Sequence, residues 1–343
     1  MIDLEENQLE FSFPEVHPDA QLSISFQRTL RIPDDGKTYP LPPGLGKFPL
    51  RHLEDFGHRL PDSWLERGGV IMPMYQKEAL WIYFSAHRDY ARDSAYPFAV
   101  KVYTGKINAV TGREFKNGLD ERKQDFLVVP GQPWLDGYCI EEGVIRQFVA
   151  MPLGKGYTAE EQITHEAEWG GMQIVVYPMA AAEYEQRFPR RPRQGRAREF
   201  EGKMMFNMCK SGPLGLAPGG KMKQEIYQDK FGINAWDLRQ RSRCFVHLLN
   251  SQDWQAVTGE KAPSTPVDEL AYTMAGLPWF DYYDENLAAL QGANKLRSLK
   301  SISEMDHKRV REPGDHEDVQ YRRVIKLGPN KRVHEGNFWD ENV

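Results

Sequence analysis

The feature that most constrains the fold is a series of short apolar segments between Val70 and Tyr177, separated by glycine, proline and asparagine. Each segment has the length of a strand and is too short for a typical helix. We expect strands at 70–74, 79–85, 98–103, 126–129, 138–140, 144–150 and 172–177. The pattern predicts a β-rich α+β fold with a mostly antiparallel sheet or sandwich core and short peripheral helices.

Strands are also expected outside this central region. Leu9, Phe11 and Phe13 alternate with polar residues, and 22–26 repeats the pattern, as in strands with one buried face. The apolar stretch 243–250 predicts a further, buried strand.

A few segments have helical spacing. Residues 50–60 carry leucine and phenylalanine three or four apart and end at a proline, which predicts a short amphipathic helix. Thr158 with Glu161 forms a capping-box pattern, so a helix is expected from Thr158 toward Trp169. Two more are expected at 180–188 and 284–299.

The length of 343 residues allows one large domain or two ordinary ones. We expect a core from 1 to 302, with a possible division into two lobes near 187–202, because 189–198 holds five arginines and two prolines. Residues 303–343 contain 8 basic and 9 acidic side chains and few aliphatic ones. This stretch is expected to be a charged arm, partly disordered.

The charge balance indicates which partners to expect. The chain has 44 Lys and Arg against 49 Asp and Glu, a net charge of −5, which argues against a nucleic-acid protein. The three cysteines cannot all pair, the first residues do not resemble a secretory signal, and no apolar run reaches the ~18 residues of a membrane span. We therefore expect a cytoplasmic protein without a transmembrane segment.

One candidate catalytic group lies on the helix expected after Thr158. Glu161, His165 and Glu168 would share a helix face and could hold a divalent metal ion or transfer a proton. The alternative interpretation is a solvated acidic face, and no HExxH zinc motif is present. No motif indicates a cofactor.

A glycine-rich segment ending at Lys221 has the spacing of a phosphate loop. Met222 occupies the place of the Ser or Thr that such a loop needs, and Pro218 interrupts the backbone donors. A structural Gly/Pro loop is the simpler interpretation, with Lys221 still available for an anion.

Tryptophans beside carboxylates form the third candidate. Trp134 with Asp136, Trp279 with Asp281, and Trp236 beside an aspartate could hold a sugar ring or a planar ligand. If two such units met, their carboxylates could act as acid and base on a glycosidic bond. The alternative is that the tryptophans anchor loops to the core.

These candidates predict one site. We expect the loops around 130–137, 213–221 and 277–281 to come together over the sheet and shape one recess. Trp169 is a further ligand-binding candidate, and Arg146 could steady an anionic substrate.

Three blocks of the sequence resemble a known family: Gln124 to Gly137, Ile145 to Gly154, and Glu168 to Gln173. They resemble uncharacterised proteins of actinobacteria and fungi, and the similarity extends to 216–237 and 243–250. The resemblance covers most of the chain up to about residue 300. It implies a self-contained module and supplies no activity, cofactor or site residue.

Two functions follow as hypotheses. The first is a binding module for a small molecule or a protein, because no recognisable catalytic motif is present and ordered loops are common sites of binding residues. The second is a hydrolase acting on a carbohydrate-like or other polar substrate through Asp136, Glu161, His165 and Glu168, possibly with a metal ion. The two differ in whether these four groups line one cleft.

Overall fold

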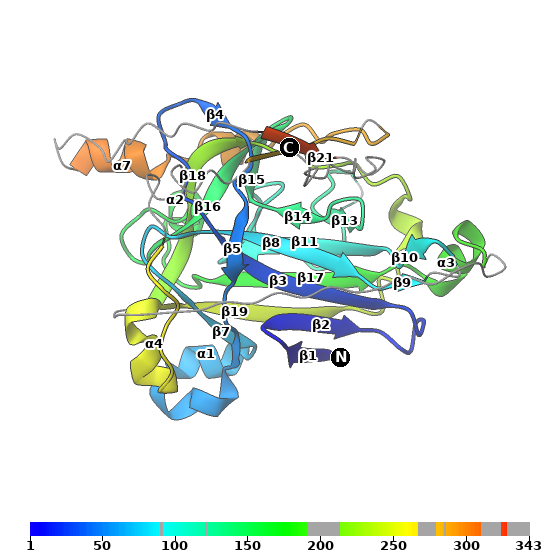
Figure 1. The fold of residues 1–343 in the computed structure, drawn as a ribbon, viewed down its shortest axis with the longest axis horizontal. Helices are drawn as coiled ribbons and strands as arrows, with labels where there is room; N and C mark the ends of the chain where they lie inside the picture. Colours follow the sequence, from blue (N-terminus) through cyan, green and yellow to red (C-terminus); the bar gives the residue numbers. More distant parts are fainter. Residues whose placement is uncertain are drawn as a thin grey trace, which may run out of the picture.

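The computed structural model describes residues 1–89, 92–120, 122–190, 213–266, 279–284, 286–309 and 324–327. Figure 1 shows that strands build the centre of the molecule and that α1, α3, α4 and α7 lie at its periphery. The fold is therefore β-rich, as the alternation of apolar residues predicted.

Most strands belong to one hydrogen-bonded network, and two small ribbons lie beside it. The main sheet contains β1 (Ile2–Glu5), β2 (Gln8–Ser12), β3 (Gln21–Thr29), β4 (Thr38–Tyr39), β5 (Gly44–Lys47), β6 (Arg51–His52), β7 (Val70–Met74), β8 (Ala79–Ala86), β11 (Phe98–Thr104), β12 (Ile107–Asn108), β13 (Leu127–Val129), β14 (Trp134–Leu135), β15 (Gly137–Glu141), β16 (Val144–Pro152), β17 (Met172–Pro178), β18 (Pro213–Lys223) and β19 (Ser242–Asn250). The ribbons pair β9 (Arg88–Asp89) with β10 (Ser94–Ala95), and β20 (Trp279–Tyr282) with β21 (Val324–Leu327).

The pairing is mostly antiparallel. Strands β1, β2, β3, β8, β16 and β18 pair in succession, and β18 continues through β19 and β17 to β11. Among the described strands, the parallel pairs are β18 with β4, β19 with β7 and β20 with β21. This topology confirms the expected α+β class with a mostly antiparallel core.

The helices are short. They are η1 (Glu54–Arg59), α1 (Asp62–Arg67), α2 (Ala159–Thr164), α3 (Ala181–Arg187), η2 (Ile233–Ala235), α4 (Ser251–Thr258), α6 (Asn294–Arg297) and α7 (Ile302–Arg309). Among the described residues, no helix has the length and apolar character needed to cross a lipid bilayer.

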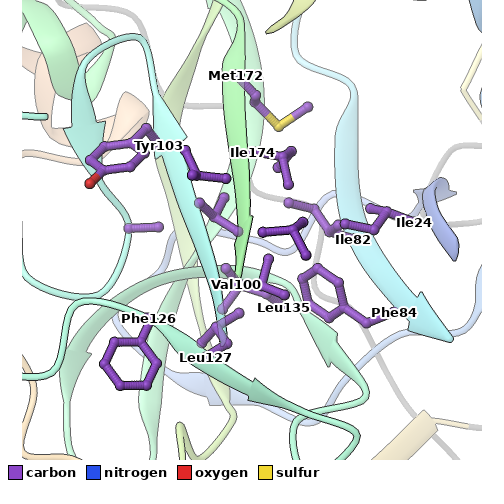
Figure 2. Packing of buried hydrophobic residues seen from close by; sticks show 14 of the residues in the cluster. Ile24, Ile82, Phe84, Val100, Tyr103, Phe126, Leu127, Leu135, Met172 and Ile174 are labelled. Atoms are coloured by element: carbon purple, nitrogen blue, oxygen red, sulfur yellow. The ribbon is translucent and has the colours of Figure 1, made fainter. Parts of the chain in front are cut away.

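The main core lies between β8 on one side and β11 and β17 on the other. Figure 2 shows Ile82 and Phe84 of β8 pointing toward Val100 of β11, Ile174 of β17 and the side chain of Leu135. All five side chains are buried. Inward residues at every second position of each strand build this core, so the alternate positions face away from it.

The strands expected between 70 and 177 are all present, with ends that differ by one or two residues. The prediction was wrong at the glycine-rich segment before Lys221, which is part of strand β18 and not a loop. Its glycines allow close packing: a Cβ on Gly220 would lie 2.3 Å from the carbonyl oxygen of Pro33, and one on Gly219 would lie 2.6 Å from Val149. The glycines serve strand packing in a crowded part of the sheet.

Three expected helices differ from the structure. In place of the helix expected over 50–60, Arg51 and His52 form strand β6 and 54–59 form the 3-10 helix η1. The helix that begins after Thr158 ends at Thr164, because His165 adopts the left-handed conformation with φ of 63° and closes the helix. The helix expected over 284–299 is reduced to α6, and β20 ends just before it at Tyr282. Hydrogen bonds of this stretch to other segments, such as those from the Leu290 amide to the Ile226 carbonyl and from the Ala293 amide to the Cys139 carbonyl of β15, replace helical bonds.

Residues 191–212, which include most of the proposed division, lie outside the described residues. Strand β17 before them and strands β18 and β19 after them pair in the same sheet. In the charged stretch 303–343, the described residues form most of α7 and strand β21, which pairs with β20.

Candidate functional site

Four aromatic side chains meet on the outward side of β8, β14 and β20, and we call them the aromatic surface. Trp81 lies 6.0 Å from Tyr83 and 6.2 Å from Trp134, and Trp134 lies 5.0 Å from Tyr282, measured between ring centroids. All four are partly open to solvent, and Tyr83 is 40% exposed. Rings that touch each other and also face solvent are suited to stack on a ligand.

The strand register explains why these rings meet. On β8, Ile82 and Phe84 point inward, so Trp81 and Tyr83 point outward. Trp134 of β14 pairs directly with Tyr83, which places the two side chains on the same side of the sheet.

Polar side chains of β3 border the rings. Gln27 pairs with Trp81 and Ser25 with Tyr83, and the Gln27 amide donates to the Ser25 hydroxyl at 3.0 Å. The Trp81 indole N–H is buried and has no acceptor among the described residues. The backbone of β5 covers the ring edge, since a Cβ on Gly44 would lie 3.1 Å from Trp81.

Trp279 is buried and does not face solvent. It is buried in a cluster with Ile145 and Met222, and Trp134 packs against that cluster. The three stretches near 134, 222 and 279 therefore come together, and the Trp279 indole fills the interior there. Beside it, Leu41 and Phe280 exchange two backbone hydrogen bonds of 2.8 Å, which fix β20 on the body of the protein.

Two buried glutamines hold Trp134 in place. The Gln132 amide donates to the carbonyls of Trp134 and Glu225, at 3.1 and 3.2 Å. The Gln224 amide donates to the Asp136 carboxyl at 2.8 Å, and the Gln224 side-chain oxygen accepts from the Asp136 backbone N–H at 3.0 Å. These bonds tie β14 to 224–227 and fix the backbone that carries the Trp134 ring.

Carboxylates lie beside the Tyr282 end of the aromatic surface. Burial raises the pKa of Glu225, and the charges of Glu142 and Asp281 raise it further. Tyr227, whose ring centroid is 6.2 Å from that of Tyr282, hydrogen-bonds Glu225. Asp281 of β20 is close enough to Glu225 for its charge to act on that carboxyl. The surface thus offers acceptors for hydroxyl donors at one end.

Asp136 is buried below the surface and does not face it. Burial raises the pKa of its carboxyl to about 7, partly offset by the hydrogen bond from Gln224. A carboxyl with this pKa can carry a proton near neutral pH. The side chain that bonds the Asp136 carboxyl is the amide of Gln224. Asp136 therefore serves to anchor Gln224 and the backbone of β14.

The other three candidate catalytic residues have separate partners. The Glu161 carboxylate accepts from Thr158 and Gly156 in a complete capping box. His165 is exposed at the end of α2, and Glu168 is exposed 3.9 Å from the Lys106 ammonium. Asp136, Glu161, His165 and Glu168 all lie within the described residues. No side-chain hydrogen bond or ion pair joins any two of them. The shared helix face does not form because the helix ends at Thr164.

No metal-binding group is apparent at these positions. Within the described ranges, no three His, Cys, Asp or Glu side chains are placed to hold a metal ion.

Replacement of Glu161 by alanine tests its capping role. We expect the Glu161→Ala variant to lose about 1 kcal/mol of free energy of unfolding, because the capping box loses its acceptor for three donors. Glu168→Ala, at an exposed position, should change it by less than about 0.5 kcal/mol. Urea unfolding measures both, and equal losses would contradict the assignment.

Arg146 and Lys221 are cross-strand neighbours that face α7. Arg146 is buried and lies 3.5 Å from both the Asp34 and the Glu304 carboxylates. Burial acts to raise the pKa of Glu304, but hydrogen bonds from Ser301 and the charges of Arg146 and Lys221 together lower it below its ordinary value. Both basic side chains thus face a carboxylate of this chain, and Glu304 also closes a hydrogen-bonded turn with Ser301.

The two remaining tryptophan candidates, Trp236 and Trp169, make their ring contacts with residues outside the aromatic surface. Trp236 is buried against Phe126 and Phe231, and its indole N–H donates to Asp229 at 2.9 Å. Trp169 lies under the Arg67 guanidinium, 4.1 Å from the ring centroid. Trp236 therefore serves the core, whereas Trp169 belongs to a stack on β19.

Sequence reasoning missed Trp81, Tyr83 and Tyr282. The signal for the first two was present in 79–85, where large aromatics occupy the positions that alternate with Ile82 and Phe84. Two aromatic residues on the outward side of a strand are available for binding, since the inward side already supplies the core. No comparable signal identified Tyr282, because its place depends on the bridge between Leu41 and Phe280.

Comparison of the chain with protein-family models, with curated proteins and with solved structures finds no significant match.

Proposed function

We propose that this protein is a binding module that holds a carbohydrate-like ligand against the aromatic surface. The observation that carries the proposal is the mutual contact of Trp81, Tyr83, Trp134 and Tyr282 on the outward side of the sheet. Exposed apolar side chains gathered in one place commonly mark a binding site.

The chemistry around the rings supports a sugar over a purely apolar ligand. A pyranose ring stacks its C–H face on an aromatic ring and needs hydrogen-bond partners for the hydroxyl groups at its edge. Gln27 of β3, which is partly exposed, borders one end of the surface, and the partly exposed Asp281 and Glu225 lie at the other. Acceptors at both ends suit a ligand longer than one ring.

The contacts of the candidate catalytic residues favour binding over the hydrolase alternative. Asp136 bonds to Gln224, Glu161 is held in the capping box, and Glu168 lies near Lys106. A glycosidase needs two carboxyl groups that flank one bond. The separate partners support a module that binds without cleaving.

We also propose a reducing compartment such as the cytoplasm. Cys139 and Cys244 are free and buried, and burial raises the pKa of each thiol to about 12. Such thiols are protonated and unreactive at neutral pH. The third cysteine, Cys209, lies outside the described residues.

The proposed function is tested with single alanine variants of the aromatic surface. Wild-type protein, Trp81→Ala and Trp134→Ala are titrated by calorimetry with neutral oligosaccharides of glucose, xylose and N-acetylglucosamine. We expect each variant to bind the recognised oligosaccharide about tenfold or more weakly, because removal of a stacked ring typically costs about 1.4 kcal/mol or more.

Tyr283→Ala is the matched control, because Tyr283 is 58% exposed and adjacent to Tyr282 in sequence. Its affinity should equal that of the wild type, and thermal unfolding checks that all variants fold. The proposal fails if none of the three sugar series binds, or if Trp81→Ala and Trp134→Ala both bind like the wild type. Release of reducing ends during incubation would favour the hydrolase instead.

A further inference from the structure

Two basic residues lie where the first turn of α7 meets the main sheet. Arg146 of β16 and Lys221 of β18 are directly paired across the two strands, so their side chains share a face. Figure 1 shows α7 at this end of the molecule, and α7 contacts β18. The Glu304 carboxylate of α7 lies 3.5 Å from the Arg146 guanidinium, and the charge of Lys221 acts on it as well.

The Arg146 guanidinium is buried with too few acceptors. Its side chain is 8% exposed, and a guanidinium carries five N–H donors. Among the described residues, its one hydrogen bond runs from Nη1 to the Gly219 carbonyl oxygen at 3.4 Å, and Nε has no partner. The Asp34 and Glu304 carboxylates are each 3.5 Å away, farther than the roughly 2.7–2.9 Å of a charge-assisted hydrogen bond. A better-placed acceptor would therefore stabilise this cation.

Arg51 shows how a carboxylate fills the same edge of a guanidinium in this protein. The Nε and Nη2 atoms of Arg51 donate to the two carboxylate oxygens of Glu260, at 2.8 and 2.7 Å. On Arg146, Nη2 is 3.5 Å from Glu304 and Nε has no acceptor. Carboxylate and phosphate groups offer two oxygens at the spacing of this edge. The edge of Arg146 is thus suited to an oxoanion and is poorly filled by Glu304.

Glu304 is the side chain that a ligand can replace. It is 55% exposed, whereas the Asp34 side chain is 9% exposed and also accepts from the Ser303 backbone N–H at 3.2 Å. No hydrogen bond or ion pair holds the Lys221 ammonium within the part of the chain that the structure describes. When Glu304 moves away, the two positive charges of Arg146 and Lys221 remain against the single negative charge of Asp34.

We propose that Arg146 and Lys221 bind an oxoanion, a carboxylate or a phosphate group, and that Glu304 occupies this site until the ligand displaces it. Two oxygens of the ligand accept from Nε and Nη2 of Arg146, and the Lys221 ammonium contacts the ligand from the neighbouring strand. Glu304 then turns toward solvent, while α7 stays attached through Ile302, which is buried in a cluster with Val149. Glu304 acts as an internal competitor for the ligand.

The probes are sodium phosphate and sodium succinate, each titrated into the full chain by calorimetry at a constant ionic strength that is set with sodium chloride. Chloride is the reference ion, because a single atom does not offer two oxygens to the guanidinium edge. Binding of phosphate alone identifies a phosphate ligand, and binding of succinate alone identifies a carboxylate. Either result supports the site, as does binding of both.

Variants of Glu304 test the competition. Glu304→Ala removes the side chain, and Glu304→Gln removes only the charge and keeps the hydrogen-bonded turn with Ser301. We expect Glu304→Ala to bind the recognised anion about tenfold more tightly than the wild type, because the site is then no longer occupied by a carboxylate of the chain. Glu304→Gln should bind it several-fold more tightly. Glu168→Gln, which removes an exposed carboxylate elsewhere, is the matched control and should bind like the wild type.

Variants of the two basic residues locate the site. Arg146→Lys keeps the charge but removes the two-donor edge, and Lys221→Met removes the second cation. Each should weaken binding about fivefold or more. Lys223→Met removes the same charge at an exposed position two residues further along β18 and should leave the affinity within about twofold. Thermal unfolding checks that every variant folds.

The inference is overturned if neither anion binds to the wild type or to the Glu304 variants. It is also overturned if the Glu304 variants bind no more tightly than Glu168→Gln, or if Arg146→Lys and Lys221→Met bind like Lys223→Met. None of these residues belongs to the aromatic surface, so the outcome is separate from that of the sugar titrations.

Discussion

Replacement of Lys101 by methionine is expected to lower the free energy of unfolding by about 3–5 kcal/mol, the range for breaking a buried ion pair. Lys101 is 1% exposed, and its ammonium lies 2.7 Å from the buried Asp125 carboxylate. It also donates to the carbonyls of Lys116 and Gly118, at 2.9 and 2.7 Å. Methionine keeps most of the volume but leaves a buried charge and two carbonyls without their donor.

Lys106→Met is the matched control. Lys106 pairs with Glu166 at 2.6 Å, but the Glu166 side chain is 60% exposed, so its loss should cost less than about 1 kcal/mol. Urea unfolding of both variants measures the difference, and the double variant Lys101→Met with Asp125→Asn should recover part of the loss. A cost below about 1 kcal/mol for Lys101→Met would contradict the role given to this pair.

The second large effect is a pH dependence that Asp136 imposes on stability. The ordinary pKa of the carboxyl is 3.8, and burial raises it to about 7 in the folded protein. Between about pH 4 and pH 7 the folded state therefore keeps a proton that the unfolded state releases, so the free energy of unfolding falls as pH rises. The stability that protonated Asp136 contributes is fully present below about pH 4 and lost above about pH 7. The free energy of unfolding changes by roughly 2–4 kcal/mol across this range.

Asp136→Asn should remove this part of the pH dependence. Asparagine stays neutral, and its side-chain oxygen can still accept the Gln224 amide hydrogen. Urea unfolding at pH 4.5, 6 and 8 should show the variant gaining roughly 2–4 kcal/mol relative to wild type as pH increases. For the control Glu168→Gln, at an exposed position, the free energy of unfolding should follow the same pH dependence as the wild type. The raised pKa assigned to Asp136 would be refuted if the Asp136→Asn variant also followed the wild-type pH dependence.

Much of the secondary structure could be predicted because its signals are local. Residues 79–85 predict strand β8, because inward Ile82 and Phe84 alternate with outward residues. Thr158 and Glu161 predict the start of α2. The end of α2 could not be predicted. A residue in the left-handed conformation closes the helix there, and a histidine such as His165 gives no strong sequence signal for that conformation, whereas a glycine would. The glycines of β18 suggested a loop because their role, close contact with Pro33, is not local.

The candidate site could be predicted only in part. Trp134 and Trp279 were singled out from their sequence neighbours, but the sequence does not tell that one faces solvent and the other is buried. Glu161 and His165 were grouped on a helix face that the chain does not continue. Trp81 was missed because its neighbours Trp134 and Gln27 belong to other strands.

The sequence by itself determined that the chain would build short strands with one apolar side, because side chains of a strand alternate between its two faces and the alternation is visible along the chain. It also determined which helix would begin with a capping box. Only the tertiary structure decided that β8 pairs with β14 and that Leu41 holds β20 beside them. Pairing between distant strands depends on the packing of the whole core, so the meeting of Trp81, Tyr83, Trp134 and Tyr282 is a property of the folded chain alone.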